Sequence, residues 1–305
     1  MPATASHATT RRNADSSRAR HRPAAAAWTM SGVGERHYEN FPVASLLCPH
    51  ALRPAVMSLY RFARTADDLA DEGQVAATQR NARLQAYRAD LVARLSGRTD
   101  SGQWPDVFAS LAQAVQQYAL PPELLHALLD AFEQDVRNPR YVDRVQLLDY
   151  CARSANPVGR LLLHLYRVGD ALSLRQSDAI CSALQLINFW QDLSVDLPRG
   201  RVYLPLADLR RHGVEPQRLL QRPDDASTRA LTRDVVQWAA ALMAEGAPLA
   251  LRLPGRIGWE LRLVVQGGLR ILEKIAAMDY ASIRTRPRLH RSDAPRLLWR
   301  ALRMT

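Results

Sequence analysis

Two acidic motifs about 125 residues apart carry the side chains of this sequence that are best suited to chemistry. The first holds Asp67 and Asp71, and the second holds Asn188, Asp192 and Asp196. Residues four apart lie on one face of an α-helix, so each motif predicts a row of oxygen ligands along a helix. Like charges at this spacing destabilise a helix by roughly 0.2–0.5 kcal/mol. We therefore expect a cation to offset the repulsion, and two rows facing each other across a cavity would suit Mg²⁺ and a diphosphate.

The first row extends toward the N-terminus on a helix that is otherwise apolar. Tyr60 and Arg64 precede the motif at helical spacing, so that either Asp67 or Asp68 continues their stripe. On spacing alone, Arg64 is better placed to pair with Asp68 or Asp71 than to bind a phosphate. A metal ion that joins such carboxylates to a diphosphate neutralises the charge that develops on the leaving group, which predicts Lewis-acid catalysis.

A solvent-exposed helix face is the alternative interpretation of either acidic row. A single Asp-x-x-x-Asp pattern is more often a solvated surface than a metal site. Two rows weaken that alternative, because both lie in apolar rather than charged helices. Asp130 and Asp135 are expected to be surface charges, with the rim of a cavity as a second interpretation for Asp135.

Composition limits the class of protein. The chain has 305 residues, of which 47% are hydrophobic, enough for one large domain or two small ones. No run of 18 or more apolar residues predicts a membrane-spanning helix. Residues 1–27 lack the apolar region of a secretory signal and are interpreted as a disordered arm. The three cysteines have no paired spacing, which argues against a disulfide framework or a zinc site and favours a reducing compartment.

The formal net charge of +11 is concentrated in arginines near both ends of the chain. Such arms suit anionic lipid, at about 1 kcal/mol per basic residue near a membrane surface. On charge alone they suit nucleic acid equally well, and solubilising tails are a further alternative. The core shows no interleaved basic and aromatic pattern, which argues against a nucleic-acid partner.

Helix signals dominate the chain, and strand signals are nearly absent. Proline and glycine mark most of the boundaries, and Asn156-Pro157 interrupts one long apolar stretch. The expected helices are 54–71, 79–95, 105–118, 121–136, 145–168 with that interruption, 172–195, one or two short helices in 206–220, 226–249 and 259–283. We expect one all-α domain over residues 30–285, a disordered basic arm over 1–29 and a basic tail over 286–305.

Taken together and in this order, the two motifs resemble those of the head-to-head isoprenoid synthases, which include squalene, dehydrosqualene and phytoene synthases. The resemblance covers about residues 36–280 and implies a single-domain isoprenoid synthase fold, a helical bundle around a central cavity. Arg201 and Tyr203 belong to a segment that resembles the family's loop after the second motif. The residues that match the family pattern of the two motifs are Tyr60, Arg64, Asp67, Asp71, Gln185, Asn188, Asp192 and Asp196.

Several departures from this pattern indicate which members of the family the sequence resembles most. Tyr38 and Asn40 stand where phytoene and dehydrosqualene synthases usually carry serines, and Gln191 stands where they typically carry arginine. Asn156-Pro157 replaces small residues in the central helix. These features resemble the bacterial hydroxysqualene synthases of hopanoid biosynthesis. The resemblance implies that presqualene diphosphate loses its diphosphate and that water captures the rearranged cation as hydroxysqualene. It also implies a companion presqualene diphosphate synthase and a flavin-dependent oxidoreductase.

The resemblance assigns expected roles to individual residues. Mg²⁺ would be held by Asp67, Asp71, Asn188, Asp192 and Asp196. Diphosphate or substrate would contact Arg64, Gln185, Arg201, Tyr203, Phe41 and Phe189. The expected catalytic residues are Tyr60, Arg64, Tyr150 and Asn156. Gln191 would weaken the diphosphate clamp, because it replaces a cation.

A carbocation needs an apolar pocket lined by aromatic faces, each contributing roughly 0.5–2 kcal/mol. Core packing is the alternative role for each candidate ring, and for Trp190 it is the favoured one. Asn156 is expected to hold the attacking water with its amide while Pro157 loosens the surrounding helix. The candidate rings are Phe41, Tyr60, Tyr150, Phe189 and Trp190.

Two other functions compete with this interpretation. The first is a head-to-head prenyltransferase that makes presqualene diphosphate, squalene or phytoene from two prenyl diphosphates, since the metal motifs would be the same. The second is a non-catalytic, basic, helical membrane-associated protein. Because the substrate and product are both apolar, we expect a cytoplasmic protein that binds the inner face of the membrane peripherally through its basic arms.

Overall fold

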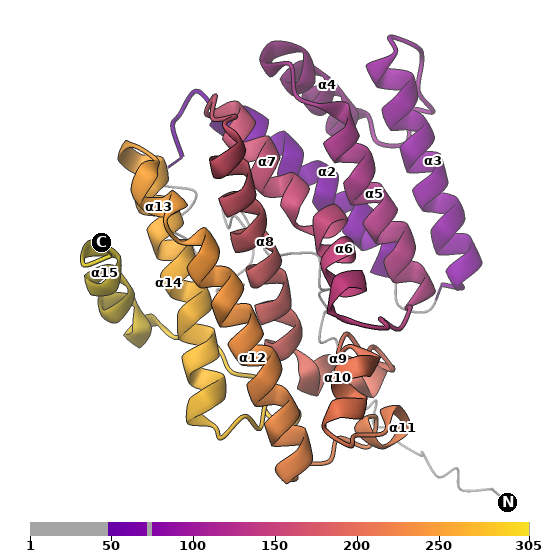
Figure 1. Cartoon of the computed structure of the whole chain (residues 1–305). Helices are drawn as coiled ribbons and strands as arrows, with labels where there is room; N and C mark the ends of the chain where they lie inside the picture. The colour runs from indigo at the N-terminus through magenta and orange to yellow at the C-terminus, as the bar shows by residue number, and fades with distance from the viewer. Residues whose placement is uncertain (1–47, 72–74, 305) are drawn as a thin grey trace, which may run out of the picture.

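The computed structural model describes residues 48–71 and 75–304, and these form helices joined by short loops, without a strand (Figure 1). The all-α fold predicted from the sequence is confirmed. The expected arm over residues 1–29, Tyr38, Asn40 and Phe41 lie outside the described residues. No helix within the described ranges combines the length and apolar character needed to cross a bilayer.

The helices follow one another along the chain with the following bounds: α2 Arg53–Asp71, α3 Ala77–Leu95, α4 Pro105–Tyr118, α5 Pro122–Arg137, α6 Arg144–Ser154, α7 Asn156–Leu165, α8 Ala171–Gln191, α9 Leu193–Asp196, η1 Leu197–Arg199, α10 Leu206–Arg211, α11 Pro216–Leu219, α12 Ala226–Gly246, α13 Leu249–Arg252, α14 Gly255–Ala277, η2 Arg291–Asp293 and α15 Ala294–Leu302. Several predicted helices match within two residues, and the break at Asn156-Pro157 is confirmed. The break between α8 and α9 at Asp192 and the helix α15 were not predicted.

Two hydrophobic cores share the bundle. One is formed by α2, α3, α4, α5 and α7, and the other by α6 and the helices from α8 to α14. Helix α8 runs through the middle and packs against α7, α12 and α14 (Figure 1). Gly246 allows α12 to approach α8 closely, because a Cβ atom there would lie 2.6 Å from the carbonyl oxygen of Gln176. Burial on most of its faces explains why α8 is apolar nearly all round.

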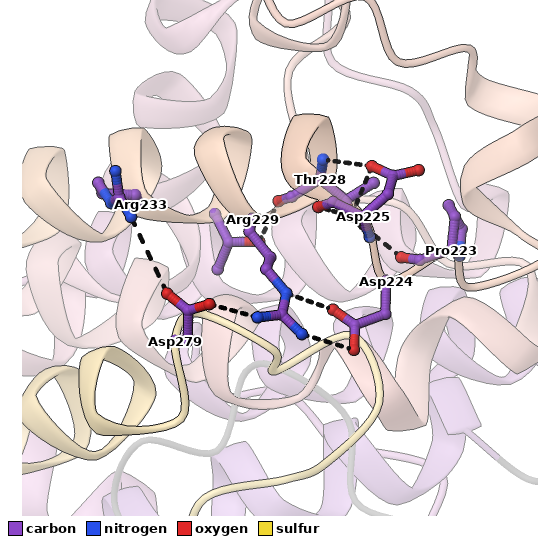
Figure 2. A network of polar contacts seen from close by, with 8 residues as sticks. Pro223, Asp224, Asp225, Thr228, Arg229, Arg233 and Asp279 are labelled. Atoms are coloured by element: carbon purple, nitrogen blue, oxygen red, sulfur yellow. Dashed lines mark hydrogen bonds and ion pairs between the residues drawn. The ribbon is translucent and has the colours of Figure 1, made fainter.

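A network of polar contacts ties the start of α12 to the turn that follows α14 (Figure 2). Asp225 caps α12 by accepting a hydrogen bond from the backbone N–H of Thr228, whose hydroxyl accepts one from the N–H of Asp225. Arg229 donates to Asp224 at 2.8 Å and to Asp279. Asp279 begins the connection between α14 and α15, so the network anchors a segment that reaches the acidic site.

Candidate active site

The first acidic motif lies at the C-terminal end of α2, and its members differ sharply in exposure. Asp67 is only 2% exposed, whereas the side chain of Asp68 is 55% exposed. Asp67 therefore continues the inward stripe that also carries half-buried Tyr60. Arg64 pairs with Asp68 at 2.6 Å, which confirms that predicted pairing, and with Asp67 at 3.3 Å. Asp71, the other predicted partner, pairs with Arg201.

The second acidic motif is bent rather than straight. Asn188 lies in the last turn of α8, Asp192 occupies the junction, and Asp196 ends α9 with 5% exposure. The backbone N–H of Asp196 still donates to the carbonyl of Asp192 at 2.9 Å, so the break is local. The three side chains remain near one another although they do not share one helix. Gln185, one turn before Asn188, is fully buried.

The two motifs meet through Arg201, which follows the second motif by five residues. Its guanidinium donates to Asp71 at 2.6 Å, across 130 residues of sequence. Burial acts to lower the pKa of Arg201, but the charges of Asp71 and Asp196 hold that pKa above its ordinary value. The predicted convergence of the two acidic rows is therefore present in the fold.

Asp135 joins this cluster, which corrects the expectation that it is a surface charge. Burial raises the pKa of Asp135 to about 7, and the charges of Asp71 and Asp196 act in the same direction. Tyr150 donates to its Oδ2 at 2.8 Å. The signal that was missed is the helical spacing of Asp135 from the buried residues of α5. Asp130, by contrast, pairs with Arg88 on the surface, as expected.

Burial raises the pKa of three carboxyls of the site, those of Asp67, Asp135 and Asp196. Burial raises the pKa of Asp67 well above its usual range, and Asp71 and Asp135 add repulsion. Burial also raises the pKa of Asp196 to about 7, and the negative charge of Asp192 contributes. Crowded, buried carboxylates of this kind favour either a proton or a nearby cation.

The donor set suits a magnesium ion. Asp67 Oδ1 and Asp135 Oδ1 are buried oxygens that accept no hydrogen bond in the part of the chain that is described. Within residues 48–71 and 75–304, no three His, Cys, Asp or Glu side chains form a ready metal cage. Magnesium commonly takes only one or two carboxylates and completes its shell with water and substrate phosphates. The available oxygens therefore fit an ion that arrives together with a diphosphate.

Arg286 supplies the cation that Gln191 lacks. Its guanidinium donates to both carboxylate oxygens of Asp192, at 2.5 and 3.2 Å. Gln191, whose side chain is buried, donates from Nε2 to the carbonyl of Pro287 at 2.8 Å and so holds the chain next to Arg286. In the sequence, Arg286 is only one arginine of a basic tail, and charge alone does not indicate which arginine folds back onto the site.

The aromatic candidates Tyr150, Phe189 and Trp190 are all fully buried in one hydrophobic core, and Tyr150 also contacts the acidic cluster. The ring of Phe189 stacks on Tyr203 with centroids 3.8 Å apart, and Tyr150 lies edge-on to Tyr141 next to Asp135. Burial raises the pKa of Tyr150 and of Tyr203 well above the usual range. Trp190 is fully buried in the core, as favoured from the sequence.

Asn156 lies at the start of α7, immediately after the break from α6. Its Oδ1 accepts a hydrogen bond from the hydroxyl of Ser182 on α8 at 3.0 Å, and both side chains are buried. Pro157 occupies the first turn of α7. Pro157 begins a new helix in its preferred position, which agrees with the predicted interruption, and its effect on the surrounding helix stays a prediction.

An apolar cavity lies near the start of α2 and beside the middle of α8. It is lined by Val56 of α2, Cys181 of α8 and Leu162 of α7, together with residues of α13 and α14. Glu260 of α14 also lines it, and burial alone raises the pKa of this carboxyl to about 7. Both helices thus pass beside an apolar cavity before they end at the acidic cluster.

Comparison with known proteins agrees with this geometry. A sequence model described as squalene/phytoene synthase matches residues 35–294. Hydroxysqualene synthase of Rhodopseudomonas palustris is 33% identical over 250 residues, covering 81% of this chain and 82% of that protein. Phytoene synthase of Cereibacter sphaeroides is 32% identical over 281 residues, covering 87% and 76%. The crystal structure of squalene synthase HpnC from Alicyclobacillus acidocaldarius is similar, with a TM-score of 0.73 and 38% identity over 80% of this chain and 90% of that one.

The helical bundle and its converging acidic motifs define an isoprenoid synthase fold. The match extends over most of the chain, including both motifs and the segment that carries Arg201 and Arg286. The chain belongs to the squalene/phytoene synthase family.

Proposed function

We propose that the protein converts presqualene diphosphate and water into hydroxysqualene and diphosphate, in a magnesium-dependent reaction of hopanoid biosynthesis. The observation that carries the proposal is the contact of Arg201 with Asp71, which joins the two acidic motifs into one site. Similarity to hydroxysqualene synthases supports this choice of reaction within the family. In such a pathway, a presqualene diphosphate synthase would supply the substrate and a flavin-dependent oxidoreductase would reduce the product to squalene.

The acidic site would bind the diphosphate through cations that are already in place. Arg64, Arg201 and Arg286 each contact a carboxylate of the cluster and would turn toward the diphosphate as the carboxylates engage magnesium. When bound, magnesium would neutralise the charge that develops on the leaving diphosphate. The residues that would hold it are Asp67, Asp71, Asn188, Asp192 and Asp196, with Asp135 as an addition from the structure.

The apolar cavity would receive the end of an isoprenoid chain. Val56 at the cavity precedes Asp67 by eleven residues on α2, about 16 Å along the helix axis. The same helices would therefore hold the two chemically different ends of one amphiphilic substrate. Tyr60 lies between these two ends on α2, and Phe189 lies beside Tyr203 near the acidic end.

The water that ends the reaction would be held by Asn156. Since its Oδ1 accepts from Ser182, the amide orientation is fixed and Nδ2 is the group that would donate to the water. Asn156→Ala would then lower the yield of hydroxysqualene at least tenfold. Ser182→Ala is the matched second variant, because it frees the amide to rotate without removing it. A normal rate of hydroxysqualene formation by Asn156→Ala would refute this role.

The decisive experiment is product analysis by mass with presqualene diphosphate as the sole substrate, with and without magnesium. Hydroxysqualene that forms only with magnesium would support the proposal. Farnesyl diphosphate alone, or geranylgeranyl diphosphate, tests the second candidate function, a head-to-head prenyltransferase. This second candidate is tested because the chain is nearly as similar to a phytoene synthase, at 32% identity, as to a hydroxysqualene synthase, at 33%. If magnesium with a prenyl diphosphate gave neither product nor thermal shift, a non-catalytic protein would be the better interpretation.

A further inference from the structure

Helix α15 has an apolar face that the protein does not cover. Leu298, Trp299 and Leu302 are 52%, 54% and 64% exposed, although the helix is nine residues long and otherwise well packed. Leu297 and Ala301, on the opposite side, are buried. Residues three and four positions apart share a helix face, so Leu302 lies on one face with both Trp299 and Leu298, and the three exposed side chains form one patch. Figure 1 shows α15 on the outside of α14, far from α3 and α4.

Ion pairs hold the inner side of α15 against α14 and so keep the apolar patch pointing outward. Asp293, just before the helix, accepts from Arg270 at 2.8 Å and pairs with Lys274 at 2.9 Å. Glu273 of α14 pairs with Arg296 at 3.1 Å and with Arg300. Fixed in this way, the patch is a permanent surface feature and not the result of a frayed helix end.

A second exposed tryptophan, Trp259, lies on α14, the helix that carries α15. Gln266 contacts Met304 at the end of α15, and Trp259 lies seven residues earlier, two turns along the same stripe of α14. Trp259 is 37% exposed and carries the guanidinium of Arg262 over its ring at 5.0 Å. Trp299 carries Arg303 in the same manner at 4.5 Å. Exposed tryptophan beside arginine is typical of the boundary between lipid headgroups and hydrocarbon.

We infer that α15 is a docking helix for an anionic lipid bilayer, with Leu298, Trp299 and Leu302 inserted at the boundary between headgroups and hydrocarbon. Arg303 beside Trp299 and Arg262 beside Trp259 give this surface cations that are complementary to anionic headgroups, whereas Arg286, Arg296 and Arg300 are engaged in ion pairs. A second copy of this chain would bring the same positive charge to the patch and is repelled. Residues 1–29 are also basic and are disfavoured for the same reason.

The test measures partition of the full chain onto vesicles without substrate, so its outcome is independent of the proposed reaction. Vesicles of phosphatidylcholine are compared with vesicles containing about one third phosphatidylglycerol. The double variant Leu298→Gln with Leu302→Gln removes apolar surface at constant charge. Its matched control is Val142→Gln with Val145→Gln, two residues that are 51% and 76% exposed on the opposite part of the bundle. Circular dichroism and thermal melting verify that both variants fold.

We expect the wild-type chain and the control to bind anionic vesicles, with binding that weakens as salt is raised. The α15 variant should bind at least tenfold more weakly. Equal binding of the α15 variant and wild type would overturn the inference, because charge alone would then account for adsorption. A lipid-free dimer that the α15 variant converts to monomer would also overturn it, in favour of a second copy. The inference would also be overturned if the chain bound a DNA duplex as tightly as vesicles and the α15 variant bound that duplex equally well.

Discussion

The acidic cluster lies at the C-terminal ends of α2 and α8, whereas the apolar cavity lies near the start of α2 and beside the middle of α8. Each region contains a carboxyl whose pKa is raised to about 7. For Asp196 in the cluster, burial acts together with the negative charge of Asp192. For Glu260 in the cavity, burial acts alone. A bound cation would offset the repulsion between Asp196 and Asp192 and so lower the pKa of Asp196. No carboxylate repels Glu260 in this way. The acidic end is therefore arranged to receive positive charge, whereas the cavity end excludes charge of either sign.

Asp196→Asn tests the acidic end most strongly. Removal of one carboxylate should lower turnover with the diphosphate substrate about 10²–10³-fold, the usual scale for loss of one group that stabilises developing charge. The free energy of unfolding should stay the same or rise at pH 8, because the repulsion between Asp196 and Asp192 is removed. Steady-state kinetics and urea unfolding measure the two effects.

Asp130→Asn is the matched control, since Asp130 is an exposed aspartate on α5. It should leave turnover within a factor of two. A loss of stability in Asp196→Asn as large as its loss of activity would contradict the interpretation of the cluster as a catalytic site and would indicate a structural role.

Arg286→Gln should have the next largest effect, about tenfold to fiftyfold on kcat/KM. It removes the guanidinium that contacts both oxygens of Asp192. Gln191→Met keeps the volume of the side chain but removes the hydrogen bond to Pro287, and it should give a smaller loss, mainly in KM, because Arg286 is then held less firmly. Arg210→Gln, at an exposed position of α10, is the control. Equal activity of Arg286→Gln and wild type would show that the contact with Asp192 is only structural.

Much of the fold could be predicted from the sequence because helix periodicity and proline positions are local signals. The helix Pro105–Tyr118 has the predicted bounds, and proline begins it. The break at Asp192 could not be predicted, because the contacts around it come from a segment 94 to 96 residues away. The role of Arg286 was missed for a similar reason, because only tertiary contacts distinguish it from the other arginines of the tail. Asp135 differs, since its helical spacing from the buried residues of α5 is a local signal.

Val56→Phe tests the cavity end of the comparison. The larger ring would fill part of the cavity between α2, α7 and α8, at a cost of about 1–3 kcal/mol if neighbours must shift. We expect kcat/KM for a long isoprenoid diphosphate to fall about tenfold, while the affinity for inorganic diphosphate with magnesium stays the same. Steady-state kinetics measure kcat/KM, and isothermal titration measures the affinity for inorganic diphosphate.

Val92→Phe provides the control for Val56→Phe, because Val92 is exposed on α3. If Val56→Phe also lost affinity for inorganic diphosphate, the apolar cavity and the acidic cluster would not act independently.

Glu260→Gln should have the smallest effect, and only on stability. The carboxyl titrates near 7 in the folded protein against an ordinary value of 4.5, so the folded state binds the proton more tightly than the unfolded state. The free energy of unfolding of the wild type should therefore fall as pH rises from about 4.5 to 7, and then level off. Glu260→Gln removes this fall and should be about 2 kcal/mol more stable than wild type at pH 8, after allowance for partial solvent screening. Cys48 and Tyr166, which also line the cavity, have pKa values raised chiefly by burial and stay neutral across this range.

Urea unfolding between pH 5 and 8.5 measures the difference in the free energy of unfolding between wild type and Glu260→Gln. Glu245→Gln, at an exposed position of α12, is the control. Parallel pH profiles for wild type and Glu260→Gln would place Glu260 in contact with water, and the cavity would then not exclude charge.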